Sequence, residues 1–411
     1  MDFYDLFFFL SMGGGLLMAF ALGANDVANS MASAVGARAI TVRQAVLIAA
    51  LLNFIGAVFL GSQVTATISK GIIDASAISD PRVLTLGMFS SLLAAGVWVL
   101  VATLTALPVS STHSIVGAIL GFGFLAGGPG VVNWLKMGGI VMSWIISPFF
   151  AAAIGFLIFS HIRKTIFVSH DFIRQAKKWG AIWMALTCGL ILVSFFNKTP
   201  FGERLDLSPF AIAATCLSGM ALAWFVSRRG LEKLVPDPGT GAEGVEQVFR
   251  KMQVFTSCYV ALSQGANDVA NAIGPVAAVY VLAKTGMLVA KAEVPLFMLV
   301  IGGLGIALGI ALLGHKVMAT VGEKITTLTN TRGFAVDIGA ATTVLVASNL
   351  GLPVSTTHAA VGAVTGVGLA RGFKAVDFGV LIRIVIYWVL TVPAAAFTSM
   401  VIYRILEWIV S

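Results

Sequence analysis

The sequence predicts an all-α polytopic membrane protein with about 12 transmembrane helices in two inverted repeats, with helices broken at the midplane. Its composition, an internal repeat and the location of its basic residues lead to this fold class. Of the 411 residues, 58% are hydrophobic and 11% are charged, about half the charged share of an average soluble protein. Charge-free runs such as Val83 to Leu107 and Met137 to Ser160 have the roughly 20 residues that a bilayer crossing needs. The composition therefore excludes a soluble globular protein.

Two different motifs each occur twice, in the same order. The motif GANDVAN occupies Gly23–Asn29 and again Gly265–Asn271, an offset of 242 residues. LPVSSTHSIVG occupies Leu107–Gly117, and the related LPVSTTHAAVG occupies Leu352–Gly362, an offset of 245 residues. Because chance does not give two unlike motifs at nearly one spacing, the chain contains an internal repeat. We divide it into a first transmembrane repeat (1–160), a two-helix connector (161–252) and a second transmembrane repeat (253–411).

Basic residues gather in the connector. Segments 161–180 and 227–252 hold ten of the 26 Lys and Arg residues and flank two apolar runs, 181–197 and 208–226. Because Lys and Arg collect in cytosolic loops, we expect both segments in the cytosol. The net charge of +8 then reflects topology, and no nucleic-acid partner is expected. If each repeat crosses the membrane five times and the connector crosses it twice, the two repeats are inverted. Both termini then lie on the outer side of the cell membrane (plasma or inner).

Two acidic residues lie among small and apolar residues at the same point of the two repeats, Asp26 and Asp268. A carboxylate inside a membrane costs about 2.5–3.5 kcal/mol, so such residues are candidates for function with a cation or proton as partner. Amide oxygens beside each acid are hard neutral ligands of the kind that Na⁺ uses, and they belong to Asn25, Asn29, Asn267 and Asn271. We also expect the helix to break at Gly23 and Gly265, which would free backbone carbonyls as ligands. The alternative is that the Asn and Asp side chains only pair across packed helices.

The second motif places hydroxyl residues after a proline, a pattern typical of a helix start. In the first repeat Pro108 precedes Ser110, Ser111 and Thr112, and in the second Pro353 precedes Ser355, Thr356 and Thr357. The first N–H groups of a helix lack intrahelical partners, so these amides and the hydroxyls together form an anion site without Lys or Arg. Two such starts that converge near the midplane would suit a tetrahedral oxyanion. The alternative is that the Ser and Thr side chains only cap their own helix.

Three further polar residues lie beside these motifs. His113 and His358 follow the hydroxyl runs and are candidates for donating to the anion, shuttling protons or hydrogen-bonding between helices, of which we favour the last. Gln264 precedes the second GANDVAN motif where Leu22 precedes the first. This difference predicts an asymmetric site.

The doubled motifs, GANDVAN followed by Pro-Val-Ser-(Ser/Thr)-Thr-His, resemble those of the inorganic phosphate transporter (PiT) family of cation-coupled phosphate symporters, and the likeness spans the whole chain. The resemblance implies twelve helices in inverted repeats, a phosphate site between hydroxyl-rich half-helices, coupling cations at the Asn-Asp pairs and a homodimer. It assigns phosphate binding to Ser110, Ser111, Thr112, Ser355, Thr356, Thr357 and Gln264. It assigns Na⁺ binding to Asn25, Asp26, Asn267 and Asp268, with Na⁺ at Asp26 and Asp268. Further candidates are Asn29, Asn271, His113 and His358.

These observations predict a secondary active transporter rather than an enzyme, a symporter that carries inorganic phosphate with Na⁺ through the lipid bilayer by alternating access. No cofactor is expected besides the coupling ion. H⁺ is the alternative to Na⁺, although the amide oxygens favour Na⁺. Sulfate is the alternative to phosphate, although only phosphate keeps an O–H that can donate to a carboxylate. More distant alternatives are an intramembrane aspartyl hydrolase, which needs two acids sharing a proton, and a passive channel, whose flux needs no coupling ion.

Overall fold

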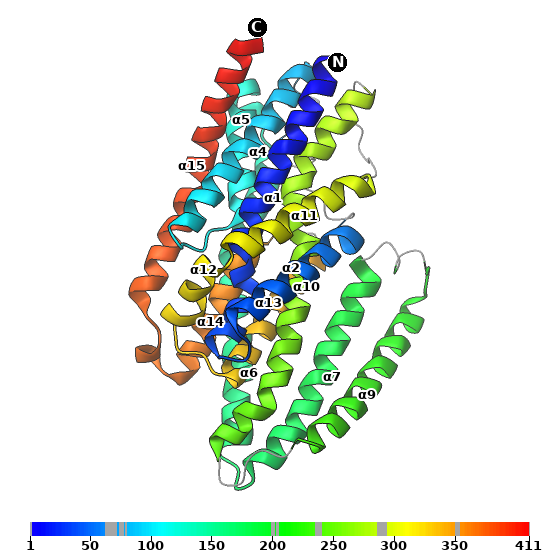
Figure 1. The fold of residues 1–411 in the computed structure, drawn as a ribbon, viewed down its shortest axis with the longest axis vertical. Helices are drawn as coiled ribbons and strands as arrows, with labels where there is room; N and C mark the ends of the chain where they lie inside the picture. Colours follow the sequence, from blue (N-terminus) through cyan, green and yellow to red (C-terminus); the bar gives the residue numbers. More distant parts are fainter. Residues whose placement is uncertain are drawn as a thin grey trace.

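The computed structural model describes residues 2–61, 72–73, 78, 80–198, 202, 205–234, 241–285, 294–349 and 354–410. Nearly all of these residues are helical (Figure 1). Within these ranges, nine helices are long and apolar enough to cross a membrane. They are α1 (Phe3–Gly36), α2 (Val42–Leu60), α4 (Pro81–Leu104), α6 (Trp134–Ile162) with the π-helical turn η3 (Arg163–Phe167), α7 (Phe172–Lys198), α9 (Pro209–Glu232), α10 (Ala242–Thr285), α11 (Leu296–Leu313) and α15 (Phe378–Val410). The chain is thus a multi-pass helical membrane protein, as its composition predicts.

Shorter helices complete each half. In the first half, α5 (Ser111–Gly127) and η2 (Pro129–Val131) lie between α4 and α6. In the second half, the chain between α11 and α15 forms α12 (His315–Ala319), η4 (Thr320–Lys324), α13 (Asn330–Asn349), α14 (Thr356–Arg371) and η5 (Phe373–Ala375). In chain order α1, α2, α4, α5, η2 and α6 correspond to α10, α11, α13, α14, η5 and α15. The repeated motifs therefore lie in repeated structure.

Local sequence determines where several helices begin. Thr41 and Gln44 form a capping box at the start of α2, in which each side chain satisfies a backbone N–H of the other residue. Asp80 caps α4 and Pro81 follows at its first position, where a proline loses no helical hydrogen bond. Ser208 and Pro209 start α9 in the same way. These starts fix the ends of the long helices and so the bundle in which the polar site lies.

The two halves pack against each other in an exchanged pattern. α1 packs against α11 as α10 packs against α2; α5 packs against α15 as α14 packs against α6; and α4 packs against α15 as α13 packs against α6. Two halves related by a twofold axis produce such exchanged pairs. In Figure 1, α1 runs away from the end at which both termini lie, and its neighbour α10 runs toward that end. Equivalent surfaces of the two halves therefore build the centre of the bundle.

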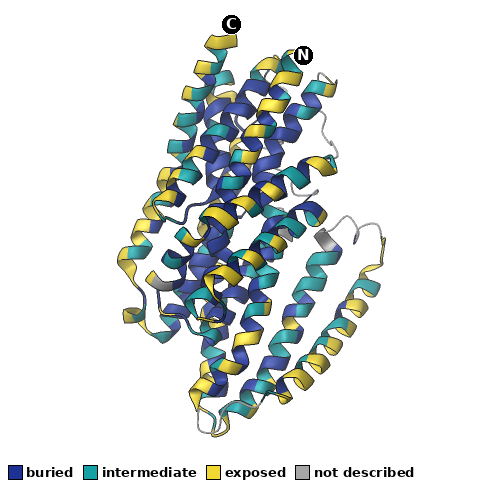
Figure 2. Cartoon of the chain, viewed as in Figure 1, coloured by how far each residue is buried: buried dark blue, intermediate teal, exposed yellow. Residues whose placement is uncertain are grey.

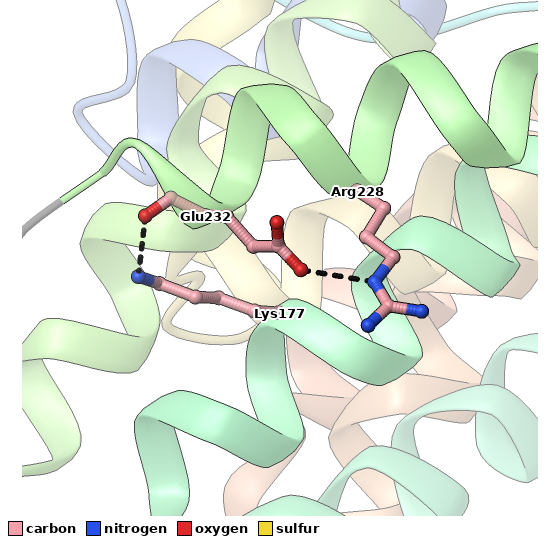
Figure 3. Close-up of polar contacts among 3 residues, drawn as sticks. All are labelled: Lys177, Arg228 and Glu232. Carbon is pink, nitrogen blue, oxygen red and sulfur yellow. Dashed lines mark hydrogen bonds and ion pairs between the residues drawn. The ribbon is translucent and has the colours of Figure 1, made fainter.

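The connector forms a hairpin of α7 and α9 beside the main bundle. α9 packs on α7 and α7 on α10, so most of α9 is exposed (Figure 2). At the basic end of this hairpin, Lys177 Nζ donates to the Glu232 carbonyl oxygen at 3.3 Å and Arg228 Nε pairs with Glu232 Oε1 at 2.9 Å (Figure 3). The Arg228 and Glu232 side chains are each 56% exposed, so their pair contributes at most about 1 kcal/mol. The contact nevertheless places the two basic segments of the connector at one end of the molecule.

The expected helix breaks at Gly23 and Gly265 are wrong, because α1 and α10 run through these residues without interruption. Both glycines instead allow two helix backbones to touch. A Cβ atom on Gly23 would overlap the carbonyl oxygen of Ile306 in α11, and one on Gly265 would overlap the carbonyl oxygen of Asn53 in α2. Small residues at such contacts are common between membrane helices, where packing replaces the hydrophobic effect as the source of stability.

We predict that Gly23→Ala lowers the free energy of unfolding by about 1–3 kcal/mol, because the added methyl group forces α1 and α11 apart. The midpoint of thermal unfolding of the purified protein measures the effect. Gly13→Ala on the same helix is the matched control, since a Cβ atom there has no neighbour within 4 Å. Equal midpoints for the two variants would contradict the close-packing role of Gly23.

Candidate functional site

Both hydroxyl motifs begin a helix inside the bundle, as predicted. Ser110 and Ser355 are the N-caps of α5 and α14, and their Oγ atoms accept from the backbone N–H of His113 at 3.1 Å and of His358 at 3.2 Å. Each of the two serines is 1% exposed. Pro353 of the second motif lies outside the described residues. Capping of their own helix therefore accounts for the side chains of Ser110 and Ser355.

The residues that follow each cap have N–H and O–H groups that the capping contacts do not use. The caps engage the N–H of the third helical residue, so the first two amides of each helix have no intrahelical acceptor. These amides belong to Ser111, Thr112, Thr356 and Thr357. They also lie at the positive ends of the two helix dipoles. Each helix start therefore offers hydroxyls, amides and a favourable potential to an anion.

The carboxylate of Asp26, in the middle of α1, joins the two helix starts. Ser111 Oγ donates to Asp26 Oδ2 at 2.6 Å, and Thr357 Oγ1 donates to Asp26 Oδ1 at 3.2 Å. Asn29, one turn further along α1, donates to the same Oδ1 at 3.2 Å. Asp26 is 1% exposed. The fold thus brings hydroxyls of both repeats to a single buried carboxylate.

Two asparagines make exchanged contacts between the repeats. Asn29 Nδ2 donates to Thr357 Oγ1 at 3.0 Å and to Thr356 Oγ1 at 3.2 Å. Asn271 Nδ2 donates to Thr112 Oγ1 at 3.3 Å. The last asparagine of each GANDVAN motif therefore contacts the hydroxyl motif of the other repeat. These contacts bring together five of the residues that the sequence proposes for the site.

Asn25 fixes the segment between α4 and α5. Its Nδ2 donates to Thr103 Oγ1 and to the Leu107 carbonyl oxygen, each at 3.0 Å, and its Oδ1 accepts from the Val109 N–H at 3.1 Å. The amide oxygen that the sequence proposes as a cation ligand is therefore engaged by the backbone here. These three bonds hold the start of α5 next to Asp26.

Three buried oxygens beside Asp26 have no hydrogen-bond partner within the part of the chain that the structure describes. They are Asp268 Oδ2, Gln264 Oε1 and Asn29 Oδ1. Asp268 Oδ1 accepts from Asn267 Nδ2 at 3.0 Å, and Gln264 Nε2 donates to the backbone carbonyl of Asp26. All three atoms are acceptors and one belongs to a carboxylate, so a cation would satisfy them. Asp26 accepts three side-chain hydrogen bonds and Asp268 accepts one, so the two acids are not equivalent.

His113 and His358 bond to long helices of the other repeat. His358 Nδ1 lies 2.9 Å from the carbonyl oxygen of Trp144 in α6, and His113 Nδ1 lies 3.3 Å from that of Trp388 in α15. Pro148 lies inside α6 and lacks the N–H that would otherwise bond the Trp144 carbonyl. The His113 ring packs on Trp144 and the His358 ring on Trp388, each with ring centroids 3.7 Å apart. Both histidines therefore make the contacts expected of residues that hydrogen-bond between helices.

A third buried acid, Asp337 in α13, is not among the residues that the sequence predicts for the site. It is 2% exposed and accepts hydrogen bonds from Ser33, Thr256 and Ser257. Its signal in the sequence is an acid set among apolar and small residues, FAVDIG. Because the first repeat has Leu92 at the equivalent position, a search for features shared by both repeats passes over it.

A cavity of about 150 Å³ lies between α7, α10 and α13 and reaches the site. Asn29, Gln264 and Thr356 line it at the site. Ser194 of α7 and Tyr259 of α10, whose hydroxyls are 3.1 Å apart, also line it. A helix of the connector therefore borders a space that is continuous with the polar site.

A membrane bundle that buries two helix starts, paired acids and unpartnered oxygens between repeated halves has the features of a transporter with an internal ion site. The comparisons with known proteins agree with this class. The sequence model of the phosphate transporter family matches residues 22–399. The chain therefore belongs to the phosphate transporter family, and it is not an enzyme.

Relatives and a solved structure match nearly the whole chain. A relative from Pyrococcus abyssi, named as a candidate phosphate permease, is 52% identical over 412 residues, 99% of each chain. The chloroplastic inorganic phosphate transporter 2-1 of Arabidopsis thaliana is 39% identical over 421 residues, which cover 95% of this chain and 70% of that protein. A solved structure titled "The sodium-dependent phosphate transporter" is 47% identical, covers 98% of this chain and 100% of its own, and has a TM-score of 0.92.

We predict that His358→Phe, which keeps a ring against Trp388, lowers the free energy of unfolding by about 1–3 kcal/mol because the Trp144 carbonyl is left buried and unpaired. Pro148→Ala returns a helical N–H to that carbonyl. The loss caused by His358→Phe should therefore be smaller in the Pro148→Ala background, as measured by thermal unfolding of the four proteins of a double-mutant cycle. Strictly additive effects would show that the histidine does not act on this carbonyl.

Proposed function

We propose that the protein is a secondary active transporter that carries inorganic phosphate together with Na⁺ by alternating access. The proposal depends on one observation, the meeting of two helix starts at the Asp26 carboxylate beside the unpartnered oxygens of Asp268 and Gln264. Donors for an anion and acceptors for a cation lie side by side there. The likeness to a sodium-dependent phosphate transporter at 47% identity supports the same pair of ions.

Phosphate would bind between the two helix starts. The donors are the hydroxyls and free amides of Ser111, Thr112, Thr356 and Thr357, with Ser110 and Ser355 as caps. Ser111 and Thr357 now donate to Asp26, so a bound anion has to take over these donors. The exchange becomes favourable once a cation neutralises the carboxylate. An O–H of phosphate can in addition donate to Asp26, a contact that sulfate cannot make.

One Na⁺ would bind at Asp268. Gln264, which the resemblance assigns to phosphate, is reassigned here to this cation, because its Nε2 already donates to the Asp26 backbone carbonyl and its free atom is an acceptor. Its Oδ2 and the amide oxygens Gln264 Oε1 and Asn29 Oδ1 are buried and unpartnered among the described residues, and all three are hard oxygen ligands that suit Na⁺. A proton would need the carboxylate alone, so the two amide oxygens favour Na⁺ over H⁺. We assign a second Na⁺ to Asp26. Asn25 neighbours this acid, with its Oδ1 bonded to the Val109 N–H in the arrangement seen here, and Asn267 neighbours Asp268.

Coupling in this arrangement is electrostatic. Two bare carboxylates beside the helix starts would repel phosphate, whereas cation-loaded carboxylates would attract it. Phosphate alone therefore binds weakly, bound phosphate raises the affinity for Na⁺ in return, and the loaded complex is the species that crosses.

The transport cycle would use the repeat. The opposite directions of α1 and α10 and the exchanged packing of the halves support two inverted repeats of five crossings, which with the connector give twelve. In this arrangement residues 1–160 and 253–411 exchange conformations around the central site. We place both termini outside and the connector loops in the cytosol on the basis of the positive charges. A homodimer in the cell membrane completes the proposal.

We predict that the purified protein in proteoliposomes accumulates radiolabelled phosphate when an inward Na⁺ gradient is imposed. An inward H⁺ gradient without Na⁺ should give no more uptake than empty liposomes, and excess unlabelled sulfate should not compete. Accumulation driven by H⁺ alone would assign the carboxylates to protons, and competition by sulfate would change the substrate. Flux without any gradient dependence would indicate a channel.

Asp268→Asn should reduce Na⁺-driven uptake at least about tenfold, because a site without the carboxylate loses its main attraction for Na⁺. Asp26→Asn should reduce uptake similarly, because it changes the hydrogen bonds of Ser111 and Thr357, the donors that phosphate would take over. Asp5→Asn, an exposed acid on the same helix as Asp26, is the matched control and should transport like the parent. Normal Na⁺-dependent uptake by the Asp26 or Asp268 variant, in folded protein, would rule out the carboxylate role.

A further inference from the structure

A buried polar cluster outside the ion site holds α13 to both repeats. Ser33 of α1 donates to Asp337 Oδ1 at 2.6 Å, while Ser257 and Thr256 of α10 donate to Asp337 Oδ2 at 2.6 Å and 2.9 Å. Within the described chain, no Lys, Arg or His pairs with this carboxylate. The cluster therefore consists of one acceptor group and three hydroxyl donors in direct contact, and we call these four residues the Asp337 lock.

The first repeat makes the same contact without any polar atom. The offset between the hydroxyl motifs relates Asp337 to Leu92, and the offset between the GANDVAN motifs relates Thr256 to Gly14. Leu92 and Gly14 also touch, since a Cβ atom on Gly14 would lie 3.4 Å from the Leu92 Cβ. An apolar contact between α1 and α4 thus corresponds to the polar contact between α10 and α13. Helix packing at this position does not require the acid.

The lock lies next to the ion site. Ser33 follows Asp26 by seven residues on α1, which is about 10 Å along the helix and nearly the same face. Ala340 and Ala341, one turn after Asp337 on α13, line the cavity that reaches Asn29 and Gln264. A change in how α13 sits against α1 and α10 would therefore change the shape of this cavity.

We infer that the Ser33–Asp337 hydrogen bond, the part of the Asp337 lock that joins the two repeats, holds the second repeat in the arrangement seen here and has to open when the protein converts to its other state. The contact between α10 and α13, which has a counterpart in the first repeat, stays in place. The inference depends on the alternating access proposed above. In inverted repeats the halves exchange conformations, so identical packing in both halves would make the two states equally stable. The lock exists in one half only and makes them unequal, and the state seen here is the one it favours.

The test measures how often the cavity is open. Val344, which lines the cavity, is changed to Cys in a background without Cys188, Cys216 and Cys258. The protein is placed in lipid nanodiscs, which leave both faces accessible, and labelled with a hydrophilic maleimide in the absence of phosphate and Na⁺. Asp337→Leu with Thr256→Gly copies the Leu92–Gly14 contact of the first repeat and should fold. We expect labelling of Val344→Cys to slow at least about fivefold in this variant, because the state seen here, in which Val344 is partly exposed, loses population.

Two further variants keep the inference falsifiable. Asp337→Asn retains hydrogen bonding to the hydroxyls without the charge and should label within about twofold of the parent, whereas Ser33→Ala removes the bond between the repeats and should slow labelling toward the rate of the Leu-Gly variant. Unchanged or faster labelling in the Leu-Gly variant would overturn the inference. Equal slowing by Asp337→Asn would also overturn it, because the charge and a bound cation would then matter rather than the bonds. Labelling needs no substrate, so a failure of phosphate uptake by the parent protein is a separate result.

Discussion

The site depends on the contact between one carboxylate and two helix ends. Asp26 receives hydroxyl donors from the start of α5 and from the start of α14, and these helices belong to different repeats. A carboxylate is costly in the membrane interior unless such donors or a cation satisfy it. The same group therefore fixes where the two helix starts meet, and in the proposed cycle it takes a cation when phosphate takes over its donors. Displacing Asp26 would release both starts.

Close backbone contacts make this arrangement possible. Gly23 lies three residues before Asp26 and brings α1 against α11, while Gly265 lies three residues before Asp268 and brings α10 against α2. The glycine of each GANDVAN motif thus allows close helix packing, whereas the Asn and Asp residues that follow it form polar contacts in the interior of the bundle. The histidines have a similar structural task, because they bond carbonyls of the long helices α6 and α15. Packing groups and the groups proposed to bind ions alternate within the same short motifs.

The sequence predicts much of this fold because the repeat is strong evidence. The helix starts at the hydroxyl motifs follow from Pro, Ser and Thr at fixed positions, and the caps Ser110 and Ser355 have the contacts that such positions favour. The uninterrupted course of α1 and α10 could not be predicted, since glycine in a membrane helix serves either a break or a close contact and only the neighbouring helix decides. The reach of Ser111 to Asp26 also could not be predicted, because it depends on tertiary packing across the bundle.

The differences between the repeats are as informative as their likeness. The shared plan of the two halves gives both an acid, an asparagine pair and a hydroxyl motif, yet Asp26 has three side-chain donors and Asp268 has one. Gln264 replaces Leu22 beside one acid, and Asp337 replaces Leu92 beside one helix pair. A symmetric molecule would bind ions equally in both halves and favour neither conformation. In the proposed cycle, polar residues in one half alone would give such a fold a preferred cation position and a preferred state, while the shared packing surfaces would still allow the halves to exchange roles.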